Sequence, residues 1–126
     1  MRPHENLQAW RKAMDLVVAI YKDTEDFPQE ERYGLISQLR RRAVSIPANI
    51  AEGAARDSKK DFARFLSNAQ GSASELETEL IIAKRLGYLE AARFSSLLSE
   101  TSVVSRLIIG LSQSLRKTFS KGHKRV

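Results

Sequence analysis

Six polar residues in the middle of the chain have the types and spacing that could carry chemistry. Three of them recur at steps of three and four, as residues on one face of a helix do: Asn49, Glu52 and Arg56. A second set follows with the same spacing: Ser72, Glu75 and Glu79. If the two faces meet, carboxylates, an amide and a guanidinium lie together between helices. Such a cluster is either a catalytic site or a hydrogen-bonded network that fixes helix register.

The catalytic alternative lacks the other residues that it needs. A di-iron helical bundle requires Glu-x-x-His pairs on two helices, and the only histidines are His4 and His123, near opposite ends of the chain. The motifs of phosphate loops, dinucleotide sites and serine hydrolases are absent, and so is cysteine. We therefore predict a protein without catalytic residues, metal or cofactor. The expected structural network consists of Asn49, Glu52, Ser72 and Glu75.

Basic residues form the second candidate site. Of the 21 lysines and arginines, five lie in residues 116–126, which contain no acid, so the first 115 residues hold 16 basic against 15 acidic groups. The net charge of +6 therefore comes mostly from this carboxyl-terminal tail. The candidate nucleic-acid contacts are Arg40, Arg41, Arg42, Arg56, Lys59, Lys60, Arg64, Arg116, Lys117, Lys121, Lys124 and Arg125.

Each part of this basic set also has an ordinary structural interpretation. Three consecutive helical residues span about 200°, so Arg40, Arg41 and Arg42 cannot all face one partner. They are equally consistent with solvated or ion-paired arginines. A basic tail is often only a solvated terminus.

Helical spacing of apolar residues predicts four helices that position these side chains, and no strand pattern occurs. We expect Asn6 to cap the first helix and the second helix to begin within residues 29–32. Ser58 followed by Asp61 is typical of a capping box at the start of the third helix, which we expect to end at Gly87.

Each predicted helix has one apolar stripe that we expect to face the core. The first stripe is Leu7, Trp10, Met14, Val17 and Tyr21. The second is Leu35, Leu39, Ala43, Ile46 and Ile50. The third is Phe62, Leu66, Ala69, Ala73, Leu76, Leu80 and Ala83. The fourth, in a helix from near residue 90, is Phe94, Leu97, Thr101, Val104, Ile108, Leu111 and Leu115. Short connections then imply an all-α, antiparallel up-down four-helix bundle over residues 1–115, with a basic tail over 116–126.

Pro47 lies inside the second stripe. Because the apolar register does not slip across it, a kinked helix that continues through Pro47 is favoured over a new helix that begins there. The third helix has small residues at 69–74, which allow a close approach by another backbone. We expect the Pro47 region to pack against them.

Some aliphatic residues lie off the stripes: Val44, Ile81, Ile82, Val103 and Ile109. They indicate either an interface or scattered surface side chains. No apolar run approaches the roughly 20 residues of a membrane span, and the first residues lack the apolar core of a signal peptide. We expect a cytoplasmic protein without membrane contact.

Several strings resemble a known family. They are S-I-P-A-N-I-A-E-G at 45–53, preceded by Arg40 and Arg41, and L-Q-A-W-R-K-A-M-D-L-V at 7–17, F-P-Q-E-E-R-Y-G-L at 27–35, G-S-A-S-E-L-E-T at 71–78 and L-G-Y-L at 86–89. In this order they are similar to the four-helix-bundle family encoded in intervening sequences of bacterial large-subunit ribosomal RNA genes, over about residues 5–90. The resemblance implies a homopentameric ring. It also implies kinship with the accessory variability protein of diversity-generating retroelements, which works with a reverse transcriptase on its template RNA.

The sequence therefore predicts a non-enzymatic, RNA-binding oligomer of four-helix bundles. The alternative is a protein-interaction scaffold or accessory subunit, for example to a reverse transcriptase, without direct nucleic-acid contact. Phosphate contacts weaken steeply with salt, so a binding titration at two salt concentrations separates the two classes.

Overall fold

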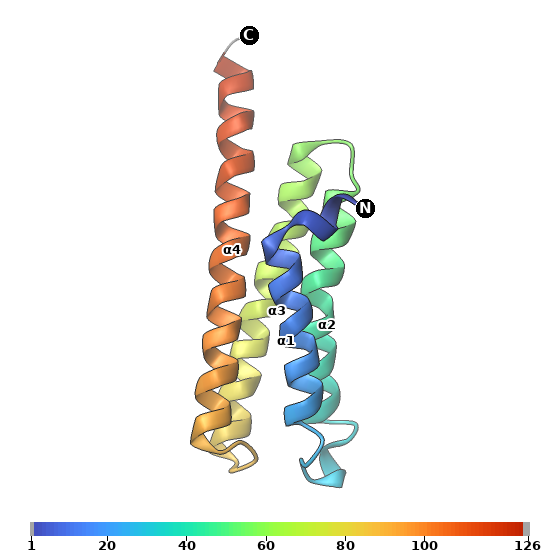
Figure 1. Ribbon diagram of the computed structural model, residues 1–126, viewed down its shortest axis with the longest axis vertical. Helices are drawn as coiled ribbons and strands as arrows, with labels where there is room; N and C mark the ends of the chain where they lie inside the picture. The colour runs from blue at the N-terminus through green and yellow to red at the C-terminus, as the bar shows by residue number, and fades with distance from the viewer. Residues whose placement is uncertain (1, 125–126) are drawn as a thin grey trace.

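Four helices make up almost the whole molecule. The computed structural model describes residues 2–124, with side chains as far as residue 117. The helices are α1 (Gln8–Asp23), α2 (Leu35–Ala54), α3 (Lys59–Arg85) and α4 (Ala91–Lys124), and the 3-10 turns are η1 (Pro3–Asn6) and η2 (Gln29–Glu31). Within this range no strand occurs. The helices run alternately up and down, which confirms the predicted all-helical fold (Figure 1).

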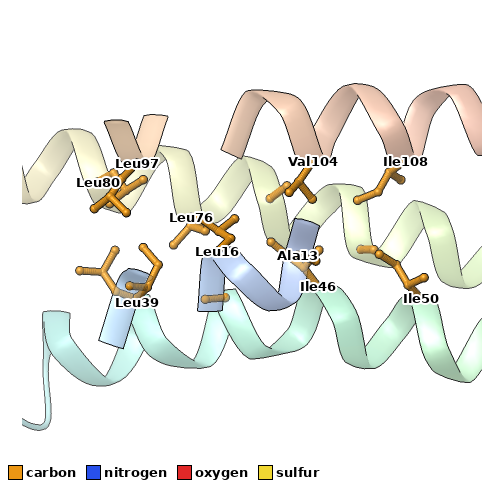
Figure 2. Close-up of a cluster of buried hydrophobic side chains, with 14 of the residues drawn as sticks. Ala13, Leu16, Leu39, Ile46, Ile50, Leu76, Leu80, Leu97, Val104 and Ile108 are labelled. Atoms are coloured by element: carbon orange, nitrogen blue, oxygen red, sulfur yellow. The ribbon is translucent and has the colours of Figure 1, made fainter. Parts of the chain in front are cut away.

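The core of the bundle takes side chains from all four helices (Figure 2). The predicted stripe of α2 is buried throughout, and those of α3 and α4 supply most of the remaining core. Fully buried examples lie on each helix: Leu16, Leu39, Ile46, Leu76, Leu80, Val104 and Ile108. Helix packing of this kind stabilises the fold mainly through removal of apolar area from water.

The buried face of α1 differs from the predicted one. Its buried residues are Ala9, Ala13, Leu16 and Ile20. In the predicted stripe, Met14 and Tyr21 are exposed, while Leu7, Trp10 and Val17 are partly buried against the core. The core face of α1 therefore combines two alanines with Leu16 and Ile20, and only Met14 and Tyr21 of the predicted stripe are exposed. The predicted cap is wrong too, because Asn6 belongs to η1 and Leu7 occupies the cap position.

Helix α2 begins later than predicted and continues through its proline. Residues 29–31 form the separate turn η2, and α2 starts at Leu35, whose N–H donates to Oε1 of Glu31 at 3.1 Å. Glu31 thus satisfies one of the unpaired donors at the helix start. Pro47 lies inside the continuous helix and is buried, so the alternative of a new helix starting there is wrong.

The end of α2 approaches α3 most closely at Gly53. A Cβ atom at this position would lie 2.8 Å from Cβ of Phe65 and 2.9 Å from Cδ1 of Phe62. Only glycine fits such a contact. The Pro47 region does meet the small residues of α3, since Oγ of Ser45 lies 2.8 Å from Oγ of Ser72. Gly71, however, faces open space and takes no part in the approach.

Both ends of α3 follow the sequence. Ser58 is its N-cap and accepts a hydrogen bond from the Asp61 N–H at 3.0 Å. After Arg85 the chain turns at Gly87, whose φ of 81° is in the left-handed region that glycine favours. The N–H groups of Gly87 and Tyr88 then donate to the carbonyls of Lys84 and Ala83, which closes the helix end.

Helix α4 extends past the rest of the bundle. It has 34 residues against 27 in α3, a difference of about 10 Å at 1.5 Å per residue. Figure 1 shows its carboxyl-terminal turns projecting beyond the α2–α3 connection. The helix runs without a break past Leu115 into the basic tail, as far as Lys124.

The same helix corrects the expectation about apolar runs. By length and composition alone, Ala91–Lys117 could cross a membrane, although only weakly, with a mean hydropathy of 1.2 in its most apolar window. Four of its residues are buried in the bundle core: Leu97, Thr101, Val104 and Ile108. Those four residues are 22% of the window, and a single helix of this length and composition is weak evidence for a membrane span.

Candidate nucleic-acid interface

The predicted basic residues divide between two opposite regions of the bundle. Helix α2 places Arg40, Arg41 and Arg42 near its start, beside the α1–α2 connection, and Arg56 follows its far end. The extended end of α4 and the start of α3 lie at that far end too (Figure 1). We call it the basic end, defined by Arg56, Lys59, Lys60, Arg64, Arg116 and Lys117. Lys121 and Lys124 continue the same helix, and Arg125 lies outside the described residues.

Arg40 is used within the chain. Its Nε donates to Oγ1 of Thr24 at 3.0 Å, and its Nη2 donates to the Tyr21 carbonyl at 3.3 Å. The guanidinium also lies 4.5 Å from the centre of the Tyr21 ring, a cation–π distance. These contacts satisfy a carbonyl at the end of α1 and hold α1 against α2.

Arg42 is used within the chain too, on the other side of α2. Its Nη2 lies 2.9 Å from Oε2 of Glu75, and its Nε lies 3.8 Å from Oε2 of Glu79. Arg41 differs from both neighbours, because it is exposed and makes only a 3.5 Å contact with Ser37. The triplet therefore points in three directions, and one of its members faces solvent.

Two of the arginines at the basic end lie over the same aromatic ring. Arg56 and Arg64 lie 4.8 and 4.6 Å from the centre of Phe65. Each also has an exposed ion pair with a neighbour on its own helix or the adjoining turn, Arg56 with Glu52 at 2.9 Å and Arg64 with Asp61 at 3.4 Å. Exposed pairs of this kind are weak and exchange readily with other anions.

The lysines of the basic end have no such partner. Lys59 and Lys60 are exposed at the first turn of α3, and Arg116 and Lys117 are exposed on α4. None of the four forms an ion pair within the described part of the chain. Sequence reasoning missed one more cation, Arg11 in the first turn of α1, the helix that starts at this end (Figure 1); its Nε donates to the Glu5 carbonyl at 2.8 Å. In an up-down bundle the first and third helices start at the same end, so the predicted topology could have indicated Arg11.

The predicted polar network forms in part. Asn49 donates through Nδ2 to the carbonyl and Oγ of Ser45, at 2.8 and 3.0 Å, and Ser45 meets Ser72. Glu75 joins this region through Arg42. The structure does not bring Glu52 into the network, since it is exposed and pairs with Arg56. Sequence reasoning missed Ser45 and Arg42, the two residues that link the predicted members.

Glu79 is the most deeply buried acid of this region. Only 8% of it is exposed, and its Oε1 has no hydrogen-bond partner. Burial raises the pKa of Glu79, the nearby Arg42 lowers it in part, and the charge of Glu75 raises it further. No group of three or more His, Asp or Glu side chains that could hold a metal ion occurs among the described residues.

Together, these features define a small all-helical protein with a core of aliphatic side chains and a basic end at which four exposed cations form no ion pair within the described chain. The 23S rRNA-intervening sequence protein family matches residues 5–110. The protein belongs to this family, since the match covers most of the chain.

A solved structure from Bacteroides thetaiotaomicron VPI-5482 has a similar fold. It is described as a protein of unknown function from the S23 ribosomal protein family, at 1.70 Å resolution. The two chains are 25% identical with a TM-score of 0.75, over 82% of this chain and 97% of that one. Among curated proteins, none matches the chain.

Proposed function

We propose that this protein is a non-enzymatic, RNA-binding homo-oligomer that contacts RNA through the basic end. The observation that carries the proposal is the group of exposed cations there without an ion-pair partner: Lys59, Lys60, Arg116 and Lys117. Cations that are already neutralised inside a protein release no counterions from RNA, whereas free ones do. The membership in a family described by ribosomal RNA intervening sequences agrees with an RNA partner.

The extended end of α4 adds to this surface. Lysines at 117, 121 and 124 follow one another at helical spacings of four and three. The helix that bears them continues past the rest of the bundle (Figure 1) and so lengthens the basic end. Arg56 and Arg64 contribute next to them, with exposed ion pairs that phosphate can replace.

Assembly of several copies is the second part of the proposal. Exposed aliphatic and aromatic side chains occur on all four helices, among them Val18, Val44, Ile82 and Ile109. An exposed apolar surface of this kind is typical of an interface. A pentamer is the number that the family resemblance implies. Several basic ends on one particle would bind a single strand with a gain in avidity.

A matched pair of double variants tests the RNA contact. Lys59→Ala/Lys60→Ala removes two charges from the basic end, and Lys22→Ala/Arg85→Ala removes two exposed, unpaired charges from the opposite end. Fluorescence anisotropy with a labelled single-stranded RNA at 50 and 200 mM salt measures both. We expect the first variant to flatten the slope of log affinity against log salt by about 1.4, and the second to leave it unchanged. Equal losses would indicate a general charge effect. Salt-independent or absent binding of the unmodified protein would favour the protein-interaction scaffold.

A further inference from the structure

A groove between α2 and α3 is acidic and incompletely paired. This α2–α3 groove has a volume of about 370 Å³ and is lined by Gln38, Ser74, Glu75, Thr78, Glu79 and Ile82. Among the described residues, Arg42 is the only cation that pairs with Glu75 and Glu79, and it reaches Glu79 at 3.8 Å and without a hydrogen bond. One guanidinium thus faces two carboxylates, and the groove keeps negative charge that the described chain does not neutralise.

A second groove has the opposite charge. This α1–α2 groove has a volume of about 470 Å³, and the residues that define its chemistry are Tyr21, Arg32, Tyr33, Arg40, Arg41 and Val44. None of its lining residues is acidic. Tyr33 is 87% exposed and Arg41 has only a weak contact, so both are available to a partner. Tyrosine and arginine are the residue types most enriched at protein interfaces.

The two grooves lie at the same level of the bundle. Ser37 lines the α1–α2 groove and Gln38 lines the α2–α3 groove, so both grooves flank the same turn of α2 on different faces. A basic face cannot dock on the same basic face of another copy without repulsion, which disfavours a two-fold contact. It can dock on the acidic face of the next copy. Because the contact advances around the bundle and not along it, repetition of such a head-to-tail contact can close into a ring.

We propose that the α1–α2 groove of one copy docks on the α2–α3 groove of a second copy of this chain, with Arg41 reaching Glu75 and Glu79. A small rotation of the Glu79 carboxyl about its last torsion, which is soft, presents an oxygen to the incoming guanidinium. Val44 on one side and Ile82 on the other, both 43% exposed, supply apolar area to the same contact. The charges set the orientation. This inference rests on the proposed homo-oligomer and identifies its two surfaces.

Charge reversal tests the contact. We expect Arg41→Glu and Glu75→Arg each to lower the mass measured by light scattering after size exclusion at micromolar concentration. The double variant Arg41→Glu/Glu75→Arg restores opposite charges across every contact, and we expect it to regain the mass of the unmodified protein. Arg85→Glu, an exposed reversal that lies in neither groove, is the control and should leave the mass unchanged. Circular dichroism establishes that each variant is folded.

A conservative variant covers the chance that Glu75→Arg disturbs the Arg42 pair. Glu79→Gln keeps the shape and removes the charge, and we expect it to weaken association about tenfold or more. Three results would overturn the proposal. If the unmodified protein has the mass of a monomer, the proposed homo-oligomer itself is wrong. If the assembly keeps its mass in both Arg41→Glu and Glu79→Gln, the proposed contact is wrong although the protein is still an oligomer. If Arg41→Glu keeps its mass but loses RNA affinity, the α1–α2 groove is an RNA site. The salt titration with the lysine variants of the basic end tests the RNA proposal independently of these three results.

Discussion

The start of α2, with three arginines, and the basic end, with six lysines and arginines, use their cations differently. At the start of α2, Arg40 holds the end of α1 and Arg42 holds two glutamates of α3. At the basic end, Lys59 and Lys60 have no ion-pair partner within the described chain, and Arg116 lies on a helix that leaves the bundle. The amino-acid sequence alone does not distinguish the two groups of cations. The difference is whether a neighbouring helix packs against the side chain and supplies a partner. A cation between packed helices supports the fold, whereas a cation at the tip of the bundle is available to a ligand.

Removal of residues 116–126 should have the largest effect on the basic end. If all five basic groups of a subunit contact single-stranded RNA, the truncation flattens the salt slope by about 3.5 units. Between 50 and 200 mM salt, that difference is roughly a hundredfold in affinity. Anisotropy titrations at four salt concentrations measure it, with unchanged circular dichroism as the control for folding. An unaltered slope would mean that the extended helix does not contact RNA.

A pair of glycine variants tests what positions the basic end. Gly53→Ala pushes a methyl group against the side chains of Phe62 and Phe65. Arg56 lies over the ring of Phe65. Overpacking typically costs 1–3 kcal/mol, partly offset by about 1 kcal/mol of helix propensity. Gly71→Ala meets no atom within 4 Å, so propensity alone should make it more stable by up to about 1 kcal/mol. Urea unfolding at constant m-value measures both. Equal stability of the two variants would contradict the close approach.

Arg40→Ala tests the structural use of the arginine triplet. The variant loses two hydrogen bonds to the end of α1 and the stacking on Tyr21, which together cost about 1–2 kcal/mol at this partly buried site. Lys60→Ala, at the basic end, should change stability by less than about 0.5 kcal/mol. In RNA titrations we expect the opposite order: Lys60→Ala binds RNA more weakly than the unmodified protein, and Arg40→Ala binds it with unchanged affinity. If Arg40→Ala lost RNA affinity without losing stability, Arg40 would be an RNA contact and not a structural residue, which contradicts the difference proposed between the two regions.

Periodicity predicted the helices well because three of the four apolar stripes are also the buried ones. For α1 it predicted the helix but the wrong core face, because Ala9, Ala13, Leu16 and Ile20 are the residues that are buried. Apolar residues lie on more than one side of α1, so spacing alone offers two faces, and the packing of the neighbouring helices decides which of them is buried. The strings that carried the family resemblance include Gly53, whose role is visible only where Phe65 crosses it.

The residues of the predicted polar network lie on α2 and α3, but the sequence prediction set no register between the two helices. Ser45 lies opposite Ser72 and Arg42 opposite Glu75, three residues away in each helix and in opposite directions, as an antiparallel pair requires. The prediction placed Glu52 in this contact, nearly two turns further along α2. Helical spacing fixes which residues share a face but not how far one helix slides along another. That offset depends on the connection between the helices and on close contacts such as the one at Gly53.

The smallest expected effect concerns the acid that Arg42 only partly neutralises. The folded chain raises the pKa of Glu79 above its usual value of 4.5 through burial, against the attraction of Arg42 and with repulsion from Glu75. Between the usual and the raised pKa, the folded state holds a proton that the unfolded state has released. Stability from this group is therefore complete below about pH 4.5 and falls as the pH rises through the pKa of folded Glu79.

Glu79→Gln removes that pH dependence. The difference in unfolding free energy between Glu79→Gln and the unmodified chain should grow from pH 4 upward, in favour of the variant, and then level off. Urea unfolding at a series of pH values, at concentrations low enough to dissociate any assembly, measures this difference and cancels other titrating groups such as Glu100. Arg42 keeps its 2.9 Å pair with Glu75 in the variant, so the start of α2 stays intact. A difference independent of pH would mean that Arg42 neutralises Glu79 fully, and that every charge around the arginine triplet except Arg41 is satisfied within the chain.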